Sequence, residues 1–101
     1  MTLKQIREDL RAIRYYYIRK EYFDAVTQIV GTNSILEKAK MYNEAVKTAP
    51  PKLYDLYTGL YIRGNTQEAF SAELGYTPEY VQMQHKKLLL FLQTKLKEVK
   101  S

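Results

Sequence analysis

The sequence predicts an all-α protein, and three kinds of observation support this fold class. Apolar residues recur at spacings of three and four along most of the chain, which is the period of one helix face. Residues that cap helix N-termini precede several of these stretches, and glycine or proline follows them. We therefore expect about four to five helices: an N-terminal helical hairpin, and then a three-helix unit with a long last helix.

Composition limits the protein class. A chain of 101 residues makes one small domain, or one motif with an appendage. It has no cysteine, so disulfides and thiolate chemistry are excluded. Leu88–Leu92, the longest uninterrupted apolar run, is too short to span a bilayer, and the N-terminus lacks the apolar core of a signal peptide. We expect a soluble intracellular protein with no membrane partner. Its ten tyrosines favour apolar surface that is half-exposed or lies at an interface.

Positive charge is gathered at the two ends of the chain. The formal net charge is +5, which permits a polyanionic partner without requiring one. Residues 1–20 hold six basic against two acidic side chains, and residues 80–101 hold five against one. Residues 51–79 hold two basic against four acidic side chains. Positive charge is therefore concentrated on the first helix and on the end of the last helix.

The first helix is expected to begin near Leu3 and to run to Gly31, with a bend at 15–22. Its apolar face is Leu3, Ile6, Leu10, Ile13 and Tyr17, and it continues in a shifted phase through Ile18, Tyr22, Ala25, Val26 and Ile29. Beside it lies a basic row, Lys4, Arg7, Arg11 and Arg14. We favour a solvated flank for this row, because charged flanks of apolar faces are common. The alternative is a row that faces phosphate groups.

A second helix is expected from Ile35, after a capping box formed by Ser34 and Glu37. Pro50-Pro51 would stop it and is the best boundary between an N-terminal hairpin (1–49, for packing or dimerisation) and a second unit (50–101) within one compact domain. The apolar side of this helix is Ile35, Ala39, Tyr42, Ala45, Val46 and Ala49.

The remaining chain predicts a helix followed by two helices joined at a sharp turn. The supporting helix starts near Pro51, ends before Gly64, and displays Leu53, Leu56, Tyr57, Leu60 and Tyr61. Asn65 or Thr66 can cap the next helix, Gln67 to Leu74, and Gly75 permits the left-handed backbone that ends it. Thr77 and Pro78 then start the last helix, whose core stripe is Val81, Leu88, Leu92, Leu96 and Val99. Small Ser71 and apolar Val81 stand where a helix-turn-helix needs them.

The residues from Leu56 to Leu92 resemble the fourth conserved region of bacterial sigma factors and its phage-encoded relatives, including ArpU-type phage regulators. The resemblance implies a helix-turn-helix that regulates transcription in the cytoplasm of a bacterial host cell. It is carried by Leu56, Tyr61, Ile62, Gly64, Thr66, Glu68, Leu74, Gly75, Tyr76, Thr77, Glu79 and Val81. In that family, residues matching Thr77 and Glu79 meet DNA. Pro78 and Gln82 stand where arginines are usual, and Gln84 stands where an apolar core residue is usual.

We accordingly predict contact with double-stranded DNA, with the last helix in the major groove. Glu79 would accept from cytosine, Gln82 would pair with adenine, and Met83 would meet a thymine methyl group. Lys86 and Lys87 would bind the phosphate backbone. The predicted contact set is Thr66, Gln67, Thr77, Pro78, Glu79, Gln82, Met83, Lys86 and Lys87. Simple solvent exposure is the alternative for each base-reading residue.

An enzyme is not expected. His85 is the single histidine and is interpreted as a polar residue on the exposed part of the last helix, so no catalytic residue, zinc site or cofactor is predicted. The favoured function is sequence-specific DNA binding as a phage-type transcription regulator. A homodimer, through the Tyr-rich N-terminal helix or the Leu88–Leu92 surface, would suit a two-fold site. The main alternative is a protein-interaction module that docks on RNA polymerase or another host protein without reading DNA; a phage assembly protein is a weaker one.

Overall fold

The fold is all-α, as predicted. The computed structural model describes residues 1–30 and 34–100, and only the helical backbone at 28–30 and 98–100. In this part of the chain there are six α-helices, one π-helical turn and no strand. Their bounds are α1 Leu3–Ile18, α2 Lys20–Val30, α3 Ser34–Val46, α4 Pro51–Tyr57, the π-helical η1 Thr58–Ile62, α5 Gln67–Leu74 and α6 Pro78–Lys100. No helix of these ranges has both the length and the apolar content needed to cross a membrane.

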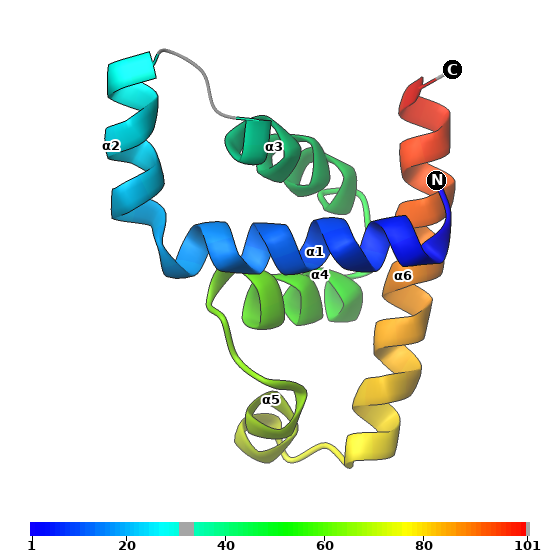
Figure 1. The fold of residues 1–101 in the computed structure, drawn as a ribbon. Coiled ribbons are helices and arrows are strands. Elements are labelled where there is room, and N and C mark those ends of the chain that lie inside the picture. Colours follow the sequence, from blue (N-terminus) through cyan, green and yellow to red (C-terminus); the bar gives the residue numbers. More distant parts are fainter. Residues whose placement is uncertain (31–33, 101) are drawn as a thin grey trace.

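The N-terminal stretch is two helices rather than one bent helix. The chain turns sharply at Arg19, between α1 and α2, so the expected bend is present (Figure 1). The turn carries α2 away from the body, and it leaves Ile18 58% and Tyr22 64% exposed. The prediction that the apolar face continues through these two residues is therefore wrong. Tyr16 is buried instead, beside Ile6, Leu10 and Ile13. The predicted end of this stretch at Gly31 lies outside the described residues.

Helix α3 begins at Ser34, one residue earlier than expected, so Ser34 is its first helical residue rather than its cap. Residues 31–33, which precede it, lie outside the described residues. The helix ends at Val46, and a turn separates it from Pro50. Its predicted apolar side is correct at four positions, which are buried: Ala39, Tyr42, Ala45 and Val46.

The supporting helix changes its winding halfway. Pro51 starts α4 as predicted, but residues 58–62 form the π-helical turn η1, which the apolar spacing did not indicate. Gly59 is buried in this turn, where a side chain would collide with the ring of Phe70 on α5. The absent side chain therefore lets η1 and α5 approach closely.

One hydrophobic core joins the N-terminal helices to α6. Helix α6 packs against α1, α3, α4 and α5, and α1 lies between α3 and η1 (Figure 1). The long last helix therefore packs on the N-terminal helices α1 and α3. Its buried residues are Leu88, Leu89, Leu92 and Leu96, whereas Leu90 is 45% exposed. The core includes residues from both sides of Pro50-Pro51.

Candidate nucleic-acid interface

The corner between α5 and α6 is fixed by caps on both helices. The Thr66 hydroxyl accepts a hydrogen bond from the Ala69 amide at 3.0 Å, and the Thr77 hydroxyl accepts one from the Tyr80 amide at 3.2 Å. Between the helices, Gly75 adopts a φ of 73° with no atom near its missing side chain. Such a left-handed residue ends a helix at little cost only when it is glycine. The helix bounds Gln67–Leu74 and the start at Pro78 agree with the sequence prediction.

The crossing of these two helices is close because the residue at the contact is small. Ser71 is 5% exposed, and its hydroxyl donates a hydrogen bond to the carbonyl of Tyr76 at 2.6 Å. Phe70 on the same helix and Val81 on α6 are also buried. The Ser71 hydroxyl therefore holds the turn in place. The side chains of Phe70 and Val81 fill the contact between the two helices.

The predicted contact residues of α6 all lie on the surface. The exposed set is Thr77, Pro78, Glu79, Gln82, Met83, Lys86 and Lys87. Glu79, Met83 and Lys86 follow one another at intervals of four and three, so they share a face, with Gln82 beside them. Among the described residues, no hydrogen bond or ion pair involves the side chains of Glu79, Gln82 or Lys86. These polar groups are therefore available to a partner.

Lys87 lies apart from this face. It borders a recess with Pro50, Lys52 and Gln84 on the side of α6 that faces α4. Gln84 is half-buried there. Val81, three residues earlier on α6, is buried as predicted.

Thr66 and Gln67, at the start of α5, lie on the opposite side of the corner. They border a recess together with Asn65, Tyr61 and Arg14 of α1. Thr66 is exposed and Gln67 is half-buried. The guanidinium of Arg14 donates a hydrogen bond to the carbonyl of Gly64 at 2.7 Å. The sequence did not indicate which elements α1 would contact. In the structure it reaches the N-terminus of α5.

The prediction that His85 is an exposed polar residue is wrong. Its ring is half-buried and its Nε2 is hydrogen-bonded to the hydroxyl of Tyr61. Burial lowers the pKa of His85, and the charge of Arg7 acts in the same direction. Burial also raises the pKa of Tyr61 to about 12, against the opposing charges of Arg14, Arg11 and Arg7. Sequence spacing could not show this, because the cover comes from α1 and η1.

The basic row on α1 is therefore close to the Tyr61–His85 pair. Lys4, Arg7 and Arg11 are exposed and Arg14 is half-buried. None of the four forms an ion pair with a carboxylate in the part of the chain that the structure describes. The row is recognisable by its spacing in the sequence, where a solvated flank was the favoured interpretation. The structure adds its position, between the N-terminus of α5 and the middle of α6.

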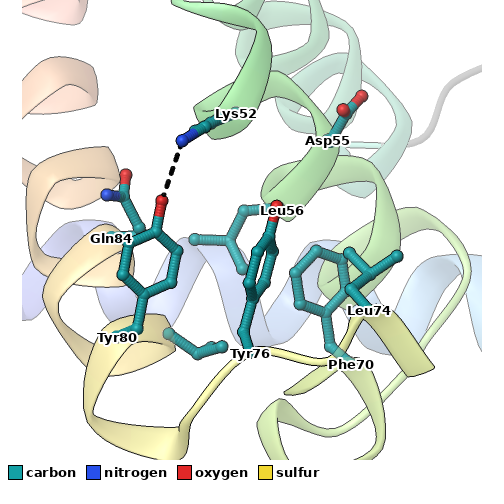
Figure 2. A pocket seen from close by; sticks show the side chains of 9 residues that line it. Lys52, Asp55, Leu56, Phe70, Leu74, Tyr76, Tyr80 and Gln84 are labelled. Atoms are coloured by element: carbon teal, nitrogen blue, oxygen red, sulfur yellow. Dashed lines mark hydrogen bonds between the residues drawn. The ribbon is translucent and has the colours of Figure 1, made fainter. Parts of the chain in front are cut away.

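A narrow apolar groove of about 40 Å³ lies between α4, α5 and α6 (Figure 2). Leu74 is 48% and Tyr76 39% exposed at its edge. The Lys52 ammonium donates a hydrogen bond to the Tyr80 hydroxyl at 3.1 Å across its mouth. The groove is lined by Lys52, Asp55, Leu56, Phe70, Leu74, Tyr76, Tyr80, Val81 and Gln84. An apolar side chain of a partner would fit such a surface.

Within residues 1–30 and 34–100, no group of three His, Asp or Glu side chains is placed to hold a metal ion. Comparison of the chain with protein-family models, with curated proteins and with solved structures finds no match.

Proposed function

We propose that the protein binds double-stranded DNA sequence-specifically, as a phage-type transcription regulator, with the first turns of α6 in the major groove. The observation that supports this most is the exposed face of α6. Glu79, Gln82 and Met83 project from the helix next to a capped corner, and their side chains make no polar contact with described residues. Carboxylate, amide and thioether groups can read cytosine, adenine and the thymine methyl group respectively.

The start of α5 would position the protein on the backbone. Thr66 and Gln67 begin α5, and the N-termini of helices attract phosphate groups. Thr77 and Pro78 offer a second N-terminus at the start of α6. Lys86 would add a phosphate contact one turn beyond Gln82. Lys87, which lies toward α4, would reach only a neighbouring part of the duplex.

The test is selection from a pool of random duplex DNA at two salt concentrations, with sequencing of the retained molecules. We expect an enriched motif, and weaker retention at high salt. Glu79→Ala and Gln82→Ala should each relax the preference at one base pair, by about 1–3 kcal/mol of discrimination. The control is Lys40→Gln, which changes an exposed side chain of α3 and should leave the motif unchanged. Absence of any motif at low salt would refute the proposal.

A second candidate function is supported by the apolar groove. A protein-interaction module would use Leu74 and Tyr76, which are exposed at its edge, to dock on RNA polymerase or another host protein. Binding of purified polymerase that is lost in Leu74→Ser, but kept in a Gln82→Ala, Lys86→Ala double variant, would favour this function over DNA reading. The opposite pattern would exclude it.

A further inference from the structure

We propose that the basic row of α1, Lys4, Arg7, Arg11 and Arg14, is a second phosphate-binding surface for duplex DNA. The inference rests on the proposed function, since it assigns to α1 the backbone contacts that a helix reading base pairs needs. Of the two interpretations of the row, a solvated flank or a row that faces phosphate groups, the inference adopts the second. The reason is that the fold places this row beside α5 and α6.

The four side chains share one face of α1. They follow at intervals of three, four and three, next to the buried face that holds Ile6, Leu10 and Ile13. The ion pairs of the described residues join Lys20 to Asp24, Lys38 to Asp9 and Lys47 to Glu44, none of which belongs to the row. The carboxylate of Asp9 on the same helix is held by Lys38 and by the Tyr42 hydroxyl. The guanidinium groups of Arg7 and Arg11 thus form no ion pair among the described residues, although the exposed Glu8 stands between them in the sequence.

One end of the row meets the side of α6 that carries Gln82. Helical spacing puts Gln82, His85, Leu89 and Gln93 on one side of α6. On that side, the Gln93 amide donates a hydrogen bond to the Met1 carbonyl at 3.0 Å, and Arg7 lies near enough to His85 to lower its pKa. Helix α1 therefore crosses α6 just beyond the exposed turns, as Figure 1 shows.

The other end of the row meets the start of α5. Arg14 hydrogen-bonds to the Gly64 carbonyl and borders the same recess as Thr66 and Gln67. The row thus connects the two places where the proposed DNA contact begins. From Lys4 to Arg14 it rises about 15 Å along the helix axis, which is the span of several successive phosphates on one strand.

The charge distribution favours such a surface on α1. Residues 51–79 hold two basic against four acidic side chains, and the exposed turns of α6 include Glu79. Affinity for DNA depends largely on cations that displace counterions from phosphates. Arginine suits that role, because its planar guanidinium binds phosphate oxygens in pairs. We infer that α1 supplies affinity, and that α6 supplies sequence preference.

The test compares two double variants that remove the same charge. Arg7→Gln, Arg11→Gln changes the row, whereas Lys40→Gln, Lys47→Gln changes one residue of α3 and the first residue after it. Helix α3 lies on the opposite side of α1 from α5 (Figure 1). All four side chains are exposed, so both variants should fold, which circular dichroism checks. Arg14 is kept, because its contact with Gly64 is structural. Affinity for the selected motif is measured across a range of salt concentrations.

We expect the arginine variant to bind about tenfold more weakly near 0.15 M salt, with a salt slope lower by about 1 to 2 and an unchanged motif. The lysine variant should lose much less affinity. If both variants lose affinity equally, the α1 surface is refuted while sequence reading by α6 stands. If the unaltered protein binds no duplex, the proposed function fails and the inference fails with it.

A second measurement locates the contact. Because the chain has no cysteine, Arg11→Cys carries a single thiol to which a DNA-cleaving iron chelate can be attached. Cleavage of the backbone beside the motif at a defined position would support the inference. Cleavage that is absent, or spread evenly along the duplex, would refute it.

Discussion

The guanidinium of Arg14 donates a hydrogen bond to the carbonyl of Gly64, fifty residues later in the chain, at 2.7 Å. This bond fastens the middle of the protein to its first helix, directly before α5. Arg14→Gln should release the segment that leads into α5. We expect a loss of about 1–2 kcal/mol in the free energy of unfolding, since a bond to a charged donor is removed.

The effect of Arg14→Gln should be strongest locally. Hydrogen exchange at the Ala69 and Phe70 amides, in the first turn of α5, is expected to accelerate more than exchange in α3. Arg11→Gln, on the exposed part of the same row, is the matched control and should leave both unchanged. Equal protection of α5 in the two variants would show that the Arg14 contact does not hold this helix.

Gly59→Ala should destabilise the protein, although alanine normally favours a helix over glycine. A side-chain carbon at position 59 would lie 2.6 Å from Cε2 of Phe70. The ring is 5% exposed, so it would have to shift within the core. We expect a loss of about 1–3 kcal/mol in a urea unfolding experiment, as for other overpacked cores.

Two further variants separate the collision with the Phe70 ring from the strain of a side chain at a positive φ. Adding Phe70→Leu to Gly59→Ala should cost less than the two single changes together, because the smaller side chain removes the collision. Gly75→Ala should destabilise by about 1 kcal/mol through its φ of 73° alone, because nothing lies near the added carbon. Additive behaviour of the first pair would contradict the proposed contact.

Ser71→Ala should cost about 1 kcal/mol, because the hydrogen bond from the hydroxyl to the Tyr76 carbonyl is lost while the small volume is kept. Ser71→Leu should cost more, since a large side chain would push α5 away from α6. Thermal unfolding of the three proteins checks this order. A leucine variant as stable as the alanine variant would mean that the crossing is looser than the burial of Ser71 indicates.

His85 should make stability depend on pH. Its folded pKa is lowered, so the unfolded chain binds the proton more readily than the folded protein does. Stability from this group is therefore complete above the unfolded value of about 6.5 and is lost as the pH falls toward the folded value. His85→Gln should remove this dependence between pH 7 and 5. Denaturant unfolding at several pH values measures it, and parallel curves for the two proteins would contradict the prediction.

Local signals in the sequence were sufficient for the helix bounds around the corner. Thr66, Gly75 and Thr77 with Pro78 each fix a helix end through their own backbone and cap, so their effect is visible without the rest of the fold. The buried face of α3 was also visible in the sequence, through the spacing of its apolar residues. The contact residues chosen from this pattern are all exposed or half-exposed. Their binding to DNA stays a prediction.

Features that depend on contacts between distant segments were missed. His85 is covered by Tyr61 and α1, and Ile18 is exposed because the chain turns at Arg19. The π-helical turn at 58–62 places Gly59 against a ring of α5, which no periodic pattern encodes. The position of the basic row beside α5 likewise depends on the packing of α1 rather than on its own sequence.

Helix α6 has 23 residues and continues from the exposed corner into the core, where it packs against α1 and α3. The part of α6 from Leu88 to Leu96 buries four leucines, and α1 and α3 help to cover this helix, so the segment 50–101 taken alone would leave part of its apolar surface uncovered. If that segment were grafted onto another protein, the apolar side of α6 that α1 and α3 cover would be exposed to solvent. A ligand held by the exposed turns would be connected to the N-terminal helices through one continuous helix.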